Sequence, residues 1–500
     1  MFNKVLVANR GEIAVRILRT LRELSIRSVA VHSDVDSQAL HVLCADEAVL
    51  LGEANPAASY LNADRIIEAA KQTGAEAIHP GYGFLSENAA FAKQVAEAGL
   101  TFIGPPAEVI AKLGDKPTAR RLLAGVGVPI VPGMDAGGAD PAALAAAAEE
   151  LGYPVLIKAA AGGGGKGMRV VESADALADA ATQAASEAKN AFGDGTIYLE
   201  KYLPRPRHVE VQILADSHGN VIHLFERECS IQRRHQKIIE ETPSPALNDG
   251  LRRRMGEAAV AAAKAVGYEN AGTVEFLLDA SGEFYFLEVN TRLQVEHPIT
   301  ELTVGVDLVR HQLEIAAGGT LALTQDRVQA RGHALECRIY AEDPAAGFMP
   351  SPGTVLFVRP ASGPGVRFDS GIYSGAEVPV HYDPILGKLI VWAEDRPAAI
   401  ARMIRALEDN VVLGVQTATG FLIDVLNSEP FARGDTHTRF LEDHFSDWQP
   451  SAEGDAWARL GYVAAELTGA GRAASGVAQS NREGDWPSPW QTLGRWDSAG

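Results

Sequence analysis

The chain has 500 residues, of which 46% are hydrophobic and 22% charged, and its formal net charge at pH 7 is −19. This length and composition are typical of a globular protein of roughly three domains, and the acidic balance argues against nucleic acid as a partner. The three scattered cysteines match neither a disulfide framework nor a zinc motif, which suits a reducing compartment. No signal peptide or membrane-spanning apolar run is recognisable, so a cytoplasmic protein without a membrane partner is expected.

The first 115 residues alternate between strands and helices. Strands are expected at residues 4–8, 28–33, 77–80 and 101–104, and helices at 12–24 and 64–73. This alternation predicts a doubly wound parallel sheet. No GxGxxG motif follows the first strand, so the usual dinucleotide site is not indicated. The loop HPGYGFLSEN (79–88) follows a strand at the sheet edge where sites gather, although loops of this composition are usually only turns.

A glycine-rich hairpin is the main feature of the next segment. Residues 128–133 are expected to form a strand and residues 141–151 an alanine-rich helix. The stretch YPVLIKAAAGGGGKGMRVV (153–171) then predicts two strands around four glycines, with Lys158 and Lys166 nearby. Glycines let backbone N–H groups approach an anion closely, which favours a phosphate-covering lid; a loop without a ligand is the alternative.

A second hairpin is expected at residues 208–216 and 221–228, and the basic run RRHQK (233–237) follows it. Four basic or potentially basic residues within five positions of an acidic chain suggest an anion site. A solvated charge run is the commoner outcome for such runs in general. A helix is expected at residues 250–266.

Two carboxylates face each other in the next hairpin, whose strands are TVEFLL (273–278) and FYFLEV (284–289). If its turn is symmetric, Glu275 and Glu288 lie directly opposite each other. Like charges in that position destabilise a hairpin, unless a divalent cation lies between them. The alternative is an ordinary half-solvated strand on which Glu275 faces water.

Polar residues continue at every second position after this pair. Asn290 would complete a hard oxygen site of the kind that Mg²⁺ prefers beside phosphates. If the chain stays extended, Arg292, Gln294 and Glu296 line the same side of the strand. The pattern predicts a metal–phosphate reaction site.

From residue 332 the composition shifts to short strands with Pro/Gly turns. Helices are expected at residues 398–407 and 417–426, which predicts a separate α+β domain carrying Arg338 on its first strand. After residue 447 the chain is rich in Gly, Ala and Ser, and this segment is expected to be a linker or tail.

Nine motifs in this order resemble the biotin carboxylase family of the ATP-grasp superfamily: ANRGEIAVRI, HPGYGFLSEN, KAAAGGGGKGMR, EKYL, RHVEVQ, RRHQK, EVNTRLQVEHP, ECRIYAED and HYDPILGKL. The resemblance covers about residues 1–446 and implies a multidomain chain of α/β and α+β parts. These parts are an N-terminal Rossmann-like domain (1–115), an ATP-grasp domain (116–331) with its lid at about 132–203, a C-terminal biotin carboxylase domain (332–446), and a linker or tail (447–500).

The resemblance also implies roles for single residues. It assigns Mg²⁺ or Mn²⁺ to Glu275, Glu288 and Asn290, in agreement with the hairpin pattern. It implies that Glu296 is the general base and that Arg338 stabilises the biotin enolate. It implies that bicarbonate and phosphate are bound by Lys237, Arg292, Gln294 and Val295. It implies that ATP is bound by a larger set of residues: Lys116, Lys158, Gly164, Gly165, Lys166, Glu200, Lys201, Tyr202, Leu203, His208, Gln232 and His235.

The implied activity is ATP- and bicarbonate-dependent carboxylation of N1′ of biotin through carboxyphosphate. This is the first half-reaction of an acyl-CoA carboxylase, with the acetyl- or propionyl-CoA type preferred. None of the six methionines precedes a lysine, so biotin is expected on a separate carrier protein or domain. The other expected partners are a second copy of the chain and a carboxyltransferase subunit. Another ATP-grasp carboxylate–amine ligase, or the corresponding part of a urea or pyruvate carboxylase, stays open as an alternative.

Overall fold

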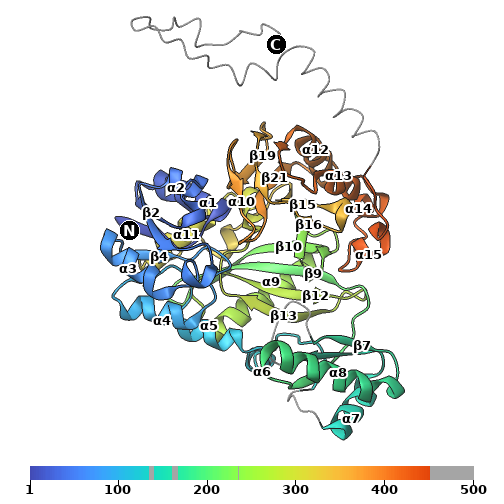
Figure 1. Ribbon diagram of the computed structural model, residues 1–500. Coiled ribbons are helices and arrows are strands. Elements are labelled where there is room, and N and C mark those ends of the chain that lie inside the picture. Colours follow the sequence, from blue (N-terminus) through green and yellow to red (C-terminus); the bar gives the residue numbers. More distant parts are fainter. Residues whose placement is uncertain (135–139, 160–166, 235, 451–500) are drawn as a thin grey trace, which may run out of the picture. The chain divides into compact units, whose positions relative to one another are not determined.

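The computed structural model describes residues 1–134, 140–159, 167–234 and 236–450, and Met1–Trp448 form one structural unit (Figure 1). Its N-terminal part contains a five-stranded sheet in the order β3-β2-β1-β4-β5, in which all neighbours are parallel. The predicted doubly wound parallel sheet is confirmed. The strands are β1 (Lys4–Val7), β2 (Arg27–Ser33), β3 (Glu47–Gly52), β4 (Ala77–His79) and β5 (Thr101–Phe102).

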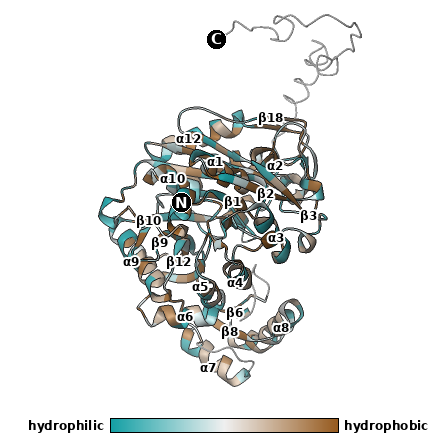
Figure 2. Cartoon of the chain, turned by 90° about the vertical axis from the view of Figure 1, so that its left-hand side faces the viewer, coloured by the Kyte–Doolittle hydropathy of each residue, from teal (hydrophilic) through white to brown (hydrophobic). Residues whose placement is uncertain are grey.

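Helices cover both faces of this sheet, and successive side chains of β1 therefore enter two different hydrophobic cores. Val5 and Val7 pack with α1 and α11, whereas Leu6 packs with α3 and α4. In Figure 2, which colours each residue by its hydropathy, β1 and β2 are mainly brown, the colour of hydrophobic residues. Asn62 and Asn88 cap α3 and α4 through their side-chain oxygens, as N-cap residues do. The helices of this part are α1 (Gly11–Glu23), α2 (Leu40–Cys44), α3 (Ala63–Thr73), α4 (Ala89–Glu97), α5 (Ala107–Gly114), α6 (Lys116–Ala124) and α11 (Leu308–Ala316).

A small three-stranded antiparallel sheet, β7-β6-β8, holds the predicted glycine-rich hairpin. The strand expected at residues 128–133 is wrong, because that segment makes only isolated bridges from Ile130 and Gly133. Pro129 and Pro132 lack the backbone N–H that a strand ladder needs. The elements here are β6 (Val155–Ala159), β7 (Arg169–Val171), β8 (Ile197–Lys201), α7 (Pro141–Leu151) and α8 (Ala174–Phe192).

An eight-stranded antiparallel sheet in the order β13-β12-β9-β10-β11-β14-β21-β19 forms the centre of the molecule. Val209, Val211 and Ile213 of β9 point to one face and pack in one core with residues of α9 (Asp249–Val266). The sheet continues without a break from β11 to β14, where Ile239 pairs with Cys337. Its strands are β9 (Arg207–Ala215), β10 (Val221–Arg233), β11 (Gln236–Thr242), β12 (Asn270–Leu278), β13 (Phe284–Asn290), β14 (His333–Tyr340), β19 (Val366–Ser370) and β21 (Ile385–Ala393).

Helices and short strand pairs complete the C-terminal part. The helices are α10 (His297–Val304), α12 (Arg396–Asp409), α13 (Thr419–Asn427), α14 (Glu429–Arg433) and α15 (Phe440–Phe445). The short strands pair as β15 (Glu342–Asp343) with β16 (Met349–Pro350), β17 (Gly353–Thr354) with β20 (Glu377–Val378), and β18 (Phe357–Arg359) with β22 (Val411–Leu413). Among the helices that the structure describes, none combines the length and apolarity needed to span a bilayer.

Candidate active site

Three carboxylates lie in a row across neighbouring strands of the central sheet. Glu210 of β9 pairs with Glu275 of β12, and Glu275 pairs with Glu288 of β13. The predicted opposition of Glu275 and Glu288 is confirmed, and a register shift directly follows Glu275 in this ladder. Like charges so placed repel, so cationic groups must lie between them.

Lys237 of β11 supplies the charge that this row needs. Its ammonium lies 2.6 Å from Glu210 Oε2, 2.8 Å from Glu275 Oε1 and 2.8 Å from Glu296 Oε1. Burial lowers the pKa of Lys237, but its three carboxylate partners outweigh burial and hold that pKa well above its ordinary value. The basic run predicted an anion site, and the side chain of Lys237 faces protein carboxylates here.

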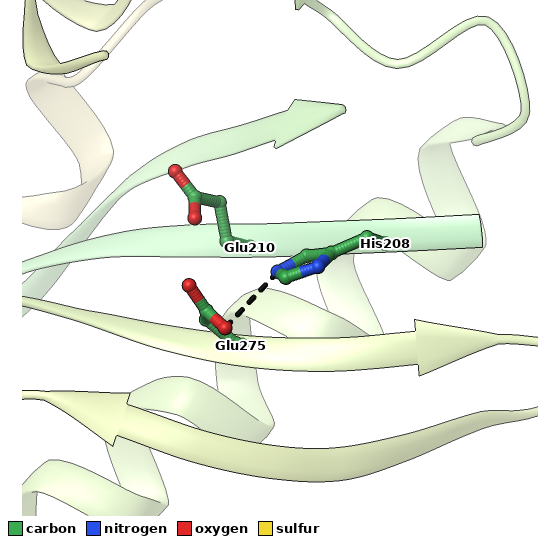
Figure 3. Close-up of side chains that lie close together, drawn as sticks. All are labelled: His208, Glu210 and Glu275. Carbon is green, nitrogen blue, oxygen red and sulfur yellow. Dashed lines mark ion pairs between the residues drawn. The ribbon is translucent and has the colours of Figure 1, made fainter. Parts of the chain in front are cut away.

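His208 completes the arrangement around Glu275. Figure 3 shows His208 and Glu210 on one strand and Glu275 on the next, with the His208 ring directed toward the Glu275 carboxylate; the His208 Nε2 to Glu275 Oε2 distance is 3.1 Å. Burial raises the pKa of Glu275, but Lys237 and His208 bring it well below its ordinary range. The ligand atoms of His208, Glu210 and Glu275 lie within 4.8 Å of one another, so this cluster has the size of a cation site.

The outer part of the predicted metal site is more open. Glu288 and Lys116 are each more than a third exposed, and the Lys116 Nζ to Glu288 Oε2 distance is 3.1 Å. Asn290 donates to Glu275 Oε1 at 2.8 Å, and its Oδ1 accepts from Arg292 at 3.2 Å. Carboxylate and amide oxygens from two adjoining strands are the donor set that Mg²⁺ or Mn²⁺ takes, so the residues fit a divalent cation.

Glu296 reaches the site by a different route from the one predicted. The expectation of an extended chain is wrong, since β13 ends at Asn290 and Glu296, with φ −81° and ψ 9°, is the N-cap of α10. Glu296 is fully buried beneath Lys237 and Arg338, and Arg338 Nη2 donates to Glu296 Oε2 at 3.0 Å. Burial raises the pKa of Glu296, but Lys237 and Arg338 outweigh burial and hold it well below its ordinary value. Glu296 is therefore a carboxylate at neutral pH.

Two residues of the site were not identified from the sequence. Glu87, in the loop 79–88, accepts from Arg292 Nε at 2.8 Å and thereby fixes that guanidinium beside Gln294. The loop follows a strand end where sites gather, but nothing in its sequence indicates that Glu87 contacts Arg292. Glu210 stands two positions after His208 on the same strand face, and that spacing was the available signal.

Most of the nucleotide residues expected from the sequence line the same cavity as Glu275 and Glu288. Lys158 donates to Glu200 at 3.0 Å, Arg120 also bonds Glu200, and Gln232 lies 2.8 Å from His208 Nδ1. The cavity has a volume of about 1000 Å³. It is lined by the predicted residues Lys158, Glu200, Lys201, Tyr202, Leu203, His208, Gln232, Lys237, Glu275, Glu288, Asn290, Arg292, Gln294, Val295 and Arg338. Gly164, Gly165, Lys166 and His235 lie outside the described residues.

Three family models match the chain in succession. They are "Biotin carboxylase, N-terminal domain" over residues 1–110, "Carbamoyl-phosphate synthase L chain, ATP binding domain" over 115–324, and "Biotin carboxylase C-terminal domain" over 336–443. Their limits together span the cavity and the sheets that form it.

Curated relatives and solved structures agree with these models. The chain is 54% identical to a pyruvate carboxylase subunit of Methanothermobacter thermautotrophicus, with 89% of this chain and 90% of that one covered. It is 53% identical to biotin carboxylase of Nostoc sp., with 88% and 99% covered. The biotin carboxylase domain dimer of Hydrogenobacter thermophilus 2-oxoglutarate carboxylase, solved with MgADP, ADP and bicarbonate, superposes with a TM-score of 0.85 at 48% identity, covering 89% and 98%. The chain belongs to the biotin carboxylase family of ATP-dependent ligases.

Proposed function

We propose that the chain carboxylates biotin on a separate carrier protein or domain, using ATP and bicarbonate. One observation carries this proposal: the Lys237 ammonium joins Glu275, from the metal-binding pair, to the buried carboxylate of Glu296 within 2.8 Å of each. A metal-binding carboxylate that lines the cavity and a proton acceptor buried behind Lys237 are thereby held at neighbouring positions. Phosphoryl transfer to bicarbonate requires that proximity.

At the nucleotide end, Lys158, Lys116 and His208 would bind the phosphates, while Glu200 and the three residues after it would hold the adenine. Glu275, Glu288 and Asn290 would hold Mg²⁺ or Mn²⁺, which when bound neutralises phosphate charge. Gly164, Gly165 and Lys166 would cover the phosphates, and deletion within this glycine run should raise the KM for ATP. An unchanged KM would remove the covering role.

At the bicarbonate end, Arg292, Gln294 and Val295 would hold the anion beside Glu296. Glu296 removes the bicarbonate proton, and the bicarbonate oxygen attacks the γ-phosphorus, giving carboxyphosphate and ADP. Carboxyphosphate breaks down to CO₂ and phosphate, and the phosphate takes the proton from N1′ of biotin. Arg338 stabilises the negative ureido oxygen, and N1′ then bonds to CO₂.

The low pKa of Glu296 implies that Lys237 also controls the basicity of this carboxylate in the proposed scheme. A carboxylate tied to Lys237 and Arg338 is a weak base. Nucleotide phosphates that enter the cavity compete for the Lys237 ammonium, and its contact with Glu296 at 2.8 Å then weakens. The basicity of Glu296 would therefore rise when ATP is bound, which couples proton removal to the presence of the phosphoryl donor.

For the final acceptor we propose an acyl-CoA of the acetyl or propionyl type, chosen by a carboxyltransferase subunit. A 2-oxo acid is the second candidate, because the relatives named above act, by their names, on pyruvate and 2-oxoglutarate. A homodimer is proposed on the likeness to a structure described as a domain dimer.

The test of the first half-reaction is ADP release in the presence of bicarbonate, with and without free biotin. Stimulation by biotin supports carboxylation, and its loss in Glu296→Gln supports the base role. Turnover that ignores biotin but responds to an added amine would replace this proposal with a carboxylate–amine ligase. Reconstitution with a biotinylated carrier and carboxyltransferase, offered acetyl-CoA, propionyl-CoA or pyruvate in turn, then tests the acceptor.

A further inference from the structure

Lys388 of β21 is completely buried, although lysine side chains are almost never fully buried unless they are paired. Its ammonium donates to the backbone oxygen of Val295 at 2.6 Å and lies 3.3 Å from Glu12 Oε1. Tyr82, whose hydroxyl donates to Glu12, lies with its ring 5.8 Å from the same ammonium. Segments from α1, the loop 79–88 and β21 therefore meet at one buried charge.

The oxygen that Lys388 holds belongs to the peptide group joining Val295 to Glu296. Holding this oxygen fixes the orientation of the peptide plane from which the Glu296 side chain projects. Glu296 itself has φ −81° and ψ 9°, a sparsely populated conformation that active-site residues often adopt. The preceding carbonyl, that of Gln294, is also held, since His297 Nδ1 donates to it at 2.7 Å.

The turn between β13 and α10 therefore has two successive carbonyls bound by buried side chains. Glu296 is the N-cap of α10 without a side-chain capping bond, so its carboxylate is free to point toward Lys237 and Arg338. Without Lys388, the Val295 carbonyl would be a buried acceptor with no bound ammonium, and the peptide plane could rotate toward other donors.

We propose that Lys388 is a positioning residue that holds the Val295–Glu296 peptide and so aims the Glu296 carboxylate at bicarbonate. This inference rests on the base role proposed above for Glu296. Lys388 touches no substrate in this scheme and acts entirely through the backbone of the turn. The Glu12 carboxylate balances its charge and keeps the ammonium in place.

A purely structural role would be served poorly by this choice of residue. Burying an ammonium and a carboxylate is costly, and apolar residues of similar volume often fill such positions with no loss of stability. An apolar side chain cannot bind the Val295 oxygen, however. The lysine adds a directed hydrogen bond at the residue next to the proposed base.

The test uses the neutral double variant Lys388→Met/Glu12→Gln, which removes both charges of this ion pair together. The matched control is Arg396→Met/Glu241→Gln, an ion pair of 2.6 Å that joins α12 to β11 of the same large sheet. A displaced base should lower kcat/KM for bicarbonate about 10²-fold, the cost of misplacing a reacting group by about 1 Å, and leave the KM for ATP within about twofold. The control should change neither value by more than about twofold.

Hydrogen exchange of the backbone amides of residues 294–297 and 299 provides a second readout that needs no activity. Exchange of these amides should speed up in the Lys388 double variant and not in the control. Unchanged exchange, or equal losses for bicarbonate and ATP, would overturn the positioning role. If the wild-type protein itself releases no ADP in response to bicarbonate, the proposed function fails, and the exchange result alone decides whether Lys388 holds the turn.

Discussion

Replacing the two opposed carboxylates one at a time should separate folding from metal binding. Glu275→Gln removes a charge that is 4% exposed and contacts both Lys237 and His208. Glu288→Gln removes a charge that is 36% exposed and contacts Lys116 at 3.1 Å. The two residues face each other in one hairpin, so the comparison holds secondary structure constant.

The structure sets the expected size of each effect. A hydrogen bond to a charged group contributes about 1.5–3 kcal/mol, and Lys237 keeps two other carboxylates after Glu275→Gln. We therefore expect a loss of about 2 kcal/mol in the free energy of unfolding. The exposed pair of Glu288 contributes at most about 1 kcal/mol. Each variant removes one of the two carboxylates proposed to hold the metal, and about 3 kcal/mol of transition-state stabilisation corresponds to about 10² in kcat/KM for MgATP.

Urea unfolding of the metal-free protein and steady-state ADP release measure the two quantities. Glu275→Gln should unfold at a lower urea concentration than wild type, whereas Glu288→Gln should unfold at nearly the same concentration as wild type. Both variants should lose about 10²-fold in kcat/KM. The control is Glu283→Gln, an exposed carboxylate in the turn of the same hairpin, which should match wild type in both assays. Equal destabilisation by Glu275→Gln and Glu288→Gln, or near-normal kcat/KM in either, would refute the reasoning.

Three further predictions concern other residues. Glu87→Gln frees Arg292 and should raise the KM for bicarbonate about fivefold, as about 1 kcal/mol of pairing predicts; an unchanged KM contradicts this. Arg338→Gln should lower biotin-stimulated ADP release about 10²-fold or more, which a biotin titration checks. Burial lowers the pKa of His79 from 6.5 to about 4, so the unfolded chain binds more protons in that window and stability falls as pH drops from about 6.5 to 4. His79→Asn should flatten the pH dependence of the urea midpoint; a parallel profile would contradict this.

The opposition of the two carboxylates in the β12–β13 hairpin could be predicted because the register of a hairpin is set locally. A short turn and the two-residue period of a strand are enough to bring Glu275 and Glu288 together. Glu210 could not be found in this way, because it meets Glu275 only through the pairing of β9 with β12, and β10, β11 and α9 lie between those strands in the chain. Pairing between distant strands leaves no local pattern in the sequence.

The direction of side chains beyond the regular strands was the weakest part of the prediction. The alternating pattern places Glu296 at the site and the resemblance makes it the base, but the extended chain that this pattern assumes ends at Asn290. Lys388 lies within a predicted strand, GKLIVWAE, whose near-continuous apolar run does not distinguish one face from the other. Only the packing of β21 against α1 and the turn before α10 shows that this lysine is buried.

The unbroken ladder from β11 to β14 has a consequence for dividing this chain. Two of the matched family models meet between residues 324 and 336, yet Ile239 on one side of that limit pairs with Cys337 on the other. A fragment cut there would end in an open strand edge, and such edges recruit other chains into aggregates. A recombinant fragment that ends between β11 and β14 should therefore aggregate or fail to fold.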